Sequence, residues 1–185
     1  FNGGSALGAG SRAVFAIVAT HLAACAGAVV WTALEWAQRG KPSVLGVISG
    51  AVAGLGTVTP ASGFILPWHG VIIGLIAGAV CYWASTVLKY RLRYDDSLDV
   101  FGVHGVGGIL GTLMAGVFAT GVLSSTPEAP NGLRGLIDGN GMQVLIQLAG
   151  IVITTAWCVA GTWLALTLTG LMTPLRATRD EEVEG

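Results

Sequence analysis

One histidine lies in a long uncharged segment that directly follows a group of acidic residues. The segment 100–127 carries no Asp, Glu, Lys or Arg, and it contains His104. Five glycines fall within residues 102–111, so neighbouring helices can approach the imidazole closely. An ionisable side chain at membrane depth is costly and usually faces a bundle interior or a water-accessible cavity. His104 is therefore the first candidate for chemistry, because a neutral imidazole both donates and accepts hydrogen bonds. The alternative is a buried histidine that only bridges two helices.

The acidic residues before this segment form a second candidate. Asp95, Asp96 and Asp99 have the spacing D-D-x-x-D, and three carboxylates on adjacent turns can share a magnesium ion that holds a diphosphate. An intramembrane prenyltransferase would also need a second acidic motif and basic residues within its spans, and the apolar segments contain neither. We favour a structural role, in which the carboxylates complement a helix dipole and pair with Arg91 and Arg93. We expect no metal site.

The other polar candidates have weaker surroundings. His21 lies within an apolar segment with no acid or glycine cluster nearby, so we expect it to be structural. His69 follows Trp68 and is interpreted as an interfacial anchor without a functional role. Three cysteines lie in different hydrophobic segments, and we expect them to be free and inert. These are Cys25, Cys81 and Cys158.

Composition identifies the class of protein. The 185 residues are 53% hydrophobic and 10% charged, with a mean hydropathy of +0.74, whereas soluble domains have about 25% charged residues. The uncharged segments 13–34, 42–88, 100–127 and 139–175 each hold at least one span of about 20 residues, and the second holds two. We therefore predict an all-α polytopic membrane protein with about five transmembrane helices. A net charge of −1 and scattered basic residues indicate no nucleic-acid partner.

Caps, prolines and charges predict the helix boundaries. We expect helices over 11–36, 43–58, 70–88, 98–123 and 142–172, with loops at 59–69 and 124–141. The segment 59–69 has two prolines and Trp68, which favours a re-entrant or surface loop. Gly46, Gly50 and Gly54 recur every four residues, so the second helix should have one face suited to close packing. The last helix would extend about 45 Å, longer than a bilayer core of about 30 Å.

Basic residues predict the orientation in the membrane. Arg12 and Arg134 fall on one side of the predicted layout, and the other seven Lys and Arg residues fall on the opposite side. Because short cytoplasmic loops carry the excess of basic residues, we expect loops 37–42 and 89–97 in the cytoplasm. Residues 1–175 then form one transmembrane domain, and 176–185 begin a cytoplasmic C-terminal tail. The chain opens at Phe1 without a methionine, and we expect it to be part of a longer protein.

Three stretches together resemble the ammonium transporter (Amt/Mep/Rh) family. They are Asp99-Val100-Phe101-Gly102-Val103-His104-Gly105, the opening Phe1-Asn2-Gly3-Gly4-Ser5-Ala6, and Arg39-Gly40-Lys41-Pro42-Ser43 followed by Gly54 to Gly63. The resemblance covers essentially all 185 residues. It implies an eleven-helix channel of two inverted repeats, of which this chain is similar to the second repeat without its first helix, plus the long last helix.

The resemblance also implies roles for single residues. It implies a pore histidine at His104, a gating phenylalanine at Phe1, a contribution to the outer ammonium site from Ser5, pore-lining side chains at Val52 and Val100, and a structural aspartate at Asp96, close to Asp99, at the cytoplasmic end.

The implied function is the transport of ammonium or ammonia through a histidine-lined apolar pore, without enzymatic activity or a cofactor. The implied setting is a multi-pass protein of the plasma membrane, in a homotrimer that a PII-type regulatory protein can contact. Two alternatives remain open at this point: an ammonium sensor with the same fold, and the less favoured prenyltransferase.

Overall fold

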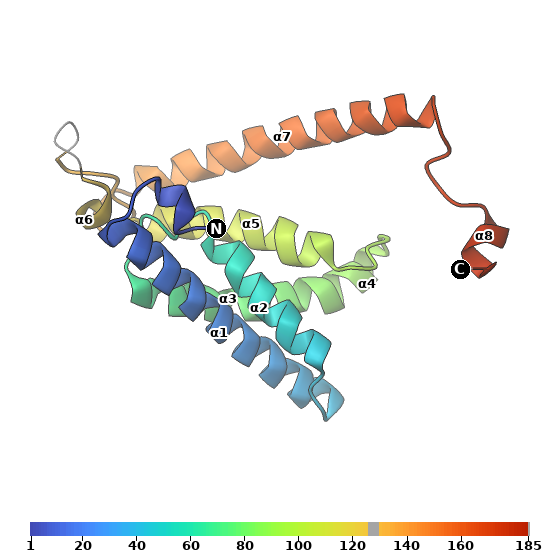
Figure 1. The fold of residues 1–185 in the computed structure, drawn as a ribbon, viewed down its shortest axis with the longest axis horizontal. Helices are drawn as coiled ribbons and strands as arrows, with labels where there is room; N and C mark the ends of the chain where they lie inside the picture. The colour runs from blue at the N-terminus through green and yellow to red at the C-terminus, as the bar shows by residue number, and fades with distance from the viewer. Residues whose placement is uncertain (126–129, 185) are drawn as a thin grey trace. The chain divides into compact units, whose positions relative to one another are not determined.

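The computed structural model describes residues 1–125 and 130–184, so the predicted loop 124–141 lies partly outside the described residues. All regular elements among the described residues are helical (Figure 1). In chain order they are η1 (Gly4–Ala6), α1 (Ser11–Arg39), α2 (Val44–Val58), α3 (Pro67–Trp83), η2 (Ala84–Leu88), α4 (Lys89–Leu92), η3 (Phe101–Gly105), α5 (Val106–Phe118), α6 (Gly121–Ser124), α7 (Met142–Gly170) and α8 (Arg179–Glu184).

Four of the described helical segments are long and apolar enough to cross a membrane. They are Ser11–Arg39, Pro67–Leu92, Phe101–Phe118 and Met142–Gly170. The fifth apolar helix, α2, has only 15 residues. At 1.5 Å per residue it is about 22 Å long, shorter than a hydrocarbon core of about 30 Å. The five predicted helices are thus present, and one of them is short.

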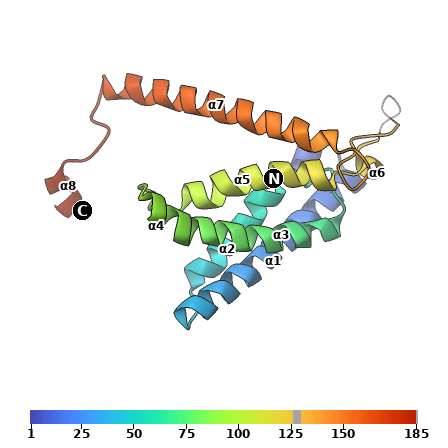
Figure 2. The same cartoon turned by 180° about the vertical axis from the view of Figure 1, so that it is seen from behind.

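Helices α1, α2 and α3 pack side by side, and glycines allow their close approach (Figure 1, Figure 2). A Cβ atom on Gly54 of α2 or on Gly74 of α3 would collide with the backbone of Ala23 in α1. A Cβ on Gly50 would lie 2.6 Å from the carbonyl oxygen of Gly27. The predicted glycine face of the second helix is therefore confirmed, because backbone lies where side chains would otherwise be.

The segment between α2 and α3 is buried rather than exposed. Ala61 and Ile65 have no exposed surface, and both belong to a core cluster with Ile73 of α3. The backbone satisfies its own polar groups, since the Ser62 N–H donates to the Val58 carbonyl at 2.9 Å. The Phe64 carbonyl accepts from a backbone N–H beyond α5 at 2.8 Å. Of the two predicted alternatives the surface loop is therefore wrong, because a segment with paired backbone groups can be buried, and the re-entrant loop stays a prediction.

Helix α3 begins at Pro67, earlier than the predicted residue 70, because proline fits the first helical position. Two residues later, Nδ1 of His69 accepts the backbone N–H of Leu66 at 3.2 Å. Only 5% of His69 is exposed, and its ring lies between those of Trp68 and Phe118. His69 is therefore a buried helix-capping residue rather than the interfacial anchor that the sequence suggested.

The fourth predicted helix, 98–123, is shorter at both ends. The Asp96 carboxylate accepts the N–H groups of Val100 and Phe101 at 2.8 and 2.9 Å, which caps the start of η3. Asp99 just before it has φ of 55°, outside the right-handed helical region. At the other end Ala119 has ψ of 133°, so the chain leaves the helix after Phe118. Polar capping and backbone conformation therefore determine both boundaries.

Residues Ala149–Gly185 form a separate compact unit. Most of α7 lies in it, and the 29 residues of α7 agree with the predicted long last helix. At the start of α8 (Arg179–Glu184), the carboxylate of Glu181 accepts the backbone N–H of Thr178 at 2.7 Å and its hydroxyl at 2.8 Å. These hydrogen bonds lower the pKa of Glu181 because they stabilise the ionised carboxylate.

Candidate functional site

His104 lies in the π-turn η3, and its side chain is exposed within the part of the chain that the structure describes. Its Nδ1 atom is 3.9 Å from the position that a Cβ on Gly56 of α2 would occupy. Glycine at this position leaves space in front of the imidazole. Within the described residues, His104 makes no hydrogen bond to another helix, so its ring nitrogens can interact with a small polar solute.

The two valines proposed for the pore lie in different surroundings. Val52 is half-buried and packs against a core cluster that includes Trp31, Cys81 and Val103. Val100 is 52% exposed and comes just before η3. The structure thus places Val52 on the packed α2 and Val100 four residues before His104, at the start of the same helical segment.

The two candidates at the N-terminus, Phe1 and Ser5, are hydrogen-bonded to each other. Ser5 donates both its backbone N–H and its hydroxyl to the carbonyl of Phe1, at 3.0 and 3.2 Å. The Phe1 side chain is 99% exposed. The two residues share a pocket of about 170 Å³, which we call the Phe1 hollow. Its lining residues are Phe1, Asn2, Ser5, Ala6, Arg12, Thr59, Ser62, Gly63 and Phe64.

Asn2 is a site residue that the sequence reasoning missed. It is only 8% exposed, and its amide donates to the hydroxyl of Thr20 at 2.9 Å and to that of Thr59 at 3.3 Å. One side chain therefore attaches the opening loop both to α1 and to the end of α2. Its place between Phe1 and Ser5 in the opening motif was the signal in the sequence.

Arg12 contributes the only charged side chain among the residues that line the Phe1 hollow. Its Nε donates to the Gly63 carbonyl at 3.0 Å, and its guanidinium carbon lies 4.6 Å from the ring centroid of Phe64. A guanidinium over an aromatic face is attracted by the ring quadrupole. Arg12 thus anchors the buried segment after α2 to the start of α1.

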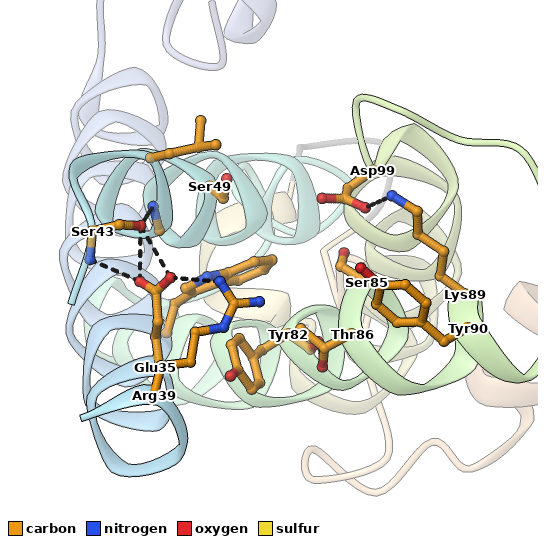
Figure 3. Close-up of a pocket in the computed structure, with 13 residues that line it drawn as sticks. Glu35, Arg39, Ser43, Ser49, Tyr82, Ser85, Thr86, Lys89, Tyr90 and Asp99 are labelled. Carbon is orange, nitrogen blue, oxygen red and sulfur yellow. Dashed lines mark hydrogen bonds and ion pairs between the residues drawn. The ribbon is translucent and has the colours of Figure 1, made fainter. Parts of the chain in front are cut away.

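A polar cavity of about 130 Å³ lies at the C-terminal ends of α1 and α3, away from the Phe1 hollow (Figure 3). We call it the Glu35 cavity. Glu35 is 4% exposed and accepts the backbone N–H and hydroxyl of Ser43, each at 3.0 Å. Arg39 pairs with the same carboxylate at 3.2 Å. Ser43 in turn accepts the N–H of Gly46 at 2.9 Å, which caps α2. Glu35 was not among the candidate residues predicted from the sequence.

Asp99 lines the same cavity. Its carboxylate pairs with Lys89 at 2.7 Å, and Figure 3 shows this pair across the cavity from Glu35. The expected pairing with Arg91 and Arg93 is therefore wrong for Asp99, and the oxygens of Asp96 bind backbone N–H groups instead. Within residues 1–125 and 130–184, no group of three or more His, Cys, Asp and Glu side chains is arranged to hold a metal ion.

Tyr94 lies in the same loop as Asp96. Its ring packs edge-on against Phe101 at 5.5 Å between centroids. Burial raises the pKa of the Tyr94 phenol, and the carboxylate of Asp96 raises it further.

The remaining candidates lie apart from these sites. His21 is exposed on α1, and its Nε2 is 3.8 Å from Sγ of Cys25, one turn later. All three cysteines are free, as predicted. Cys81 alone is buried, and Cys25 and Cys158 are exposed on their helices.

Sequence comparison supports the resemblance independently of this geometry. The sequence model of the Ammonium Transporter Family matches residues 1–185. The ammonium transporter of Bacillus subtilis is 42% identical over 185 residues, which cover all of this chain and 45% of that protein. The ammonium transporter MEP2 of Saccharomyces cerevisiae is 40% identical over 190 aligned residues, which cover 38% of its length. The chain therefore spans less than half the length of these relatives.

Solved structures agree with the sequence comparison. The crystal structure of Saccharomyces cerevisiae Mep2 superimposes with a TM-score of 0.85 and 38% identity, covering 96% of this chain and 40% of that one. A structure described as a sensor Amt protein superimposes with a TM-score of 0.83 and 28% identity, covering all of this chain and 43% of that one. The fold is thus that of a multi-pass membrane protein, and the chain belongs to the ammonium transporter family.

Proposed function

We propose that the protein containing this chain transports ammonium or ammonia across the plasma membrane through an apolar pore lined by His104. The observation that carries this proposal is the position of His104. It is an ionisable ring in a glycine-dense helix, exposed beside Gly56 and without a hydrogen-bond partner among the described residues. Such a ring at membrane depth suits a polar solute that must cross the apolar layer.

In this proposal, different residues act at successive points along the path of the solute. Ammonium is captured at the Phe1 hollow, where the Ser5 hydroxyl accepts a hydrogen bond, and the Phe1 ring acts as a gate at the entrance to the pore. The ion gives its proton to water before it enters the apolar zone, because a charge there is expensive. Ammonia then exchanges its hydrogen bonds with water for hydrogen bonds with His104. Val52 and Val100 exclude water from this stretch, and ammonia takes a proton from water on leaving it.

The proposed orientation places the Glu35 cavity at the cytoplasmic face. In the layout predicted from the sequence, seven of the nine Lys and Arg residues fall on this side, as the rule for cytoplasmic loops requires. Asp96 and Asp99 have structural roles there, since one caps η3 and the other pairs with Lys89. The tail 176–185 follows into the cytoplasm.

We further propose that the complete protein is a homotrimer and that a PII-type regulatory protein can bind its cytoplasmic face. An almost wholly apolar groove of about 340 Å³ between α1 and α2 supports a contact between copies. Its lining includes Val29 and Trp36, which are 66% and 60% exposed. Exposed apolar surface of this kind is typical of an interface or of contact with lipid.

An ammonium sensor is the second candidate, and the structural likeness to a sensor Amt protein favours it. A sensor with this fold needs ammonium binding but not passage through the pore. Equilibrium binding without flux in proteoliposomes would therefore identify a sensor, whereas saturable flux would identify a transporter.

The decisive experiment is methylammonium uptake by cells that express the full-length protein with His104→Ala. We expect maximal uptake to fall at least about tenfold, since the hydrogen bonds that replace water in the pore are lost. His21→Ala is the matched control, because His21 is an exposed histidine of another helix. Normal uptake by a correctly inserted His104→Ala protein would refute the assigned pore.

A further inference from the structure

Two π-turns contact each other beside the candidate pore histidine. The first, η2, interrupts the long helix between α3 and α4, and the second, η3, contains His104. Hydrogen bonds from residue i to i+5 are rare, and single π-turns are frequent at functional sites. The two turns come from different helices, so their meeting is a feature of the tertiary structure.

The contact between the turns is made by Gly102 and Ser85. A Cβ atom on Gly102 would collide with the Oγ of Ser85 and would lie 3.1 Å from its backbone nitrogen and 3.2 Å from its Cα. Both residues are buried. The backbone of η3 therefore rests directly on Ser85, and no side chain larger than hydrogen fits at Gly102 without a shift.

Ser85 takes part in this contact through van der Waals packing rather than through a hydrogen bond. It is 5% exposed, and within the described residues its hydroxyl has no hydrogen-bond partner. The residue also lines the Glu35 cavity, where Figure 3 shows it among the other polar side chains. A buried hydroxyl without a partner is unfavourable, so no hydrogen bond accounts for the position of Ser85 in this contact.

Two polar contacts fix the loop that joins the turns. Lys89, directly after η2, pairs with Asp99, two residues before η3, at 2.7 Å. The carboxylate of Asp96 accepts the first N–H groups of the helix that follows. The start of η3 is thus fixed at the loop, and Ser85 supports its buried side.

The number of residues in the turn determines the direction of His104. A π-turn holds one residue more than the corresponding α-helical turn, and each residue of an α-helix turns the chain by about 100°. Conversion of η3 to an α-helical turn would therefore rotate the residues before the turn, relative to the residues after it, by about this angle around the helix axis. The imidazole would then no longer lie beside Gly56.

We propose that Ser85 and Gly102 are positioning residues, whose contact holds η3 as a π-turn and thereby directs His104 into the pore. The proposal rests on the function proposed above. Neither residue touches the solute in this scheme. Both act through the position of the histidine.

The test is Gly102→Ala in the full-length protein, with uptake of methylammonium and the ¹⁵N resonances of the His104 imidazole as readouts. The resonances are assigned by their loss in His104→Ala. We expect maximal uptake to fall at least about tenfold with KM unchanged, and the resonances to move, because a small misplacement of a reacting group is costly. Alanine is the better helix former, so lower helix propensity cannot cause such a loss.

Ser85→Gly supplies the rescue and Gly108→Ala the control. Adding Ser85→Gly to Gly102→Ala removes the colliding side chain, so both uptake and the resonances should return close to wild type. A Cβ on Gly108 would meet no atom of this chain within 4 Å, so Gly108→Ala should behave as wild type. Wild-type uptake and resonances in Gly102→Ala, a loss that Ser85→Gly does not relieve, or an equal loss in Gly108→Ala would each overturn the proposal.

If Gly102→Ala does not insert, Ser85→Gly alone tests the same contact by removing its support. Moved resonances with a lower maximal rate would support the proposal, and unchanged resonances would overturn it. The resonances also separate this proposal from the proposed function. Normal uptake in His104→Ala would refute the pore, whereas resonances that move in Gly102→Ala would still establish the contact.

Discussion

The two ends of the α1–α3 bundle are built with different chemistry. At the Phe1 hollow, a neutral amide and one guanidinium hold the loops, and none of the lining residues is a carboxylate. At the Glu35 cavity, carboxylates organise the ends, because Glu35 holds Ser43 and Arg39 while Asp99 pairs with Lys89. Charge is thus neutralised in pairs at one end, whereas at the other the Ser5 hydroxyl and the exposed Phe1 ring face no charged partner within the described residues.

Removal of Glu35 should have the largest effect on stability. Glu35→Ala leaves Ser43 and Arg39 without their acceptor and loosens the start of α2. We expect a loss of about 2–3 kcal/mol, the size of hydrogen bonds to a buried charge. Thermal unfolding of the purified full-length protein measures this. Glu181→Ala, at an exposed carboxylate of the tail, is the control, and equal melting temperatures for both variants would contradict the comparison.

Removal of the Asn2 amide tests the Phe1 hollow. Asn2→Ala removes both hydrogen bonds that attach the opening loop, and we expect a loss of about 1–2 kcal/mol together with a higher KM for methylammonium. The KM rises because Phe1 and Ser5 are displaced from the hollow. Asn131→Ala, at an exposed asparagine, should change neither value. An unchanged KM in Asn2→Ala would mean that the loop position does not matter for capture.

Substitution of Arg12 should change KM for methylammonium by the smallest amount. This change should also depend most strongly on salt. Arg12→Gln removes a positive charge from the hollow, and glutamine can still donate to the Gly63 carbonyl. We expect KM for methylammonium to fall about twofold, the size of a partly exposed charge interaction of about 0.5 kcal/mol. The difference should shrink as ionic strength rises, since salt screens such charges.

Arg134→Gln is the control for Arg12, because Arg134 lies outside the hollow. A rise in KM for Arg12→Gln, or the same fall in both variants, would show that the Arg12 charge does not oppose capture. This outcome would also remove the contrast between the two ends.

Features that depend on local pattern were predictable from the sequence. The apolar segments indicated the class of protein and four long helices with α2 as a short fifth, because hydrophobicity decides which segments avoid water. The four-residue spacing of Gly50 and Gly54 predicted the close face of α2, since helical geometry puts such positions on one side. The motif around His104 led to the family.

Only the tertiary structure decided which groups meet. Two arginines lie nearer to Asp99 in the sequence than Lys89 does, yet Lys89 is its partner, because the folding of the loop brings that ammonium to 2.7 Å. His69 is buried, and its ring contacts that of Phe118, 49 residues later in the chain, at 4.9 Å between centroids. The π-turn at His104 likewise meets Ser85 across two helices. Sequence spacing determines the face of a helix, but partners depend on distances that exist only after the helices pack.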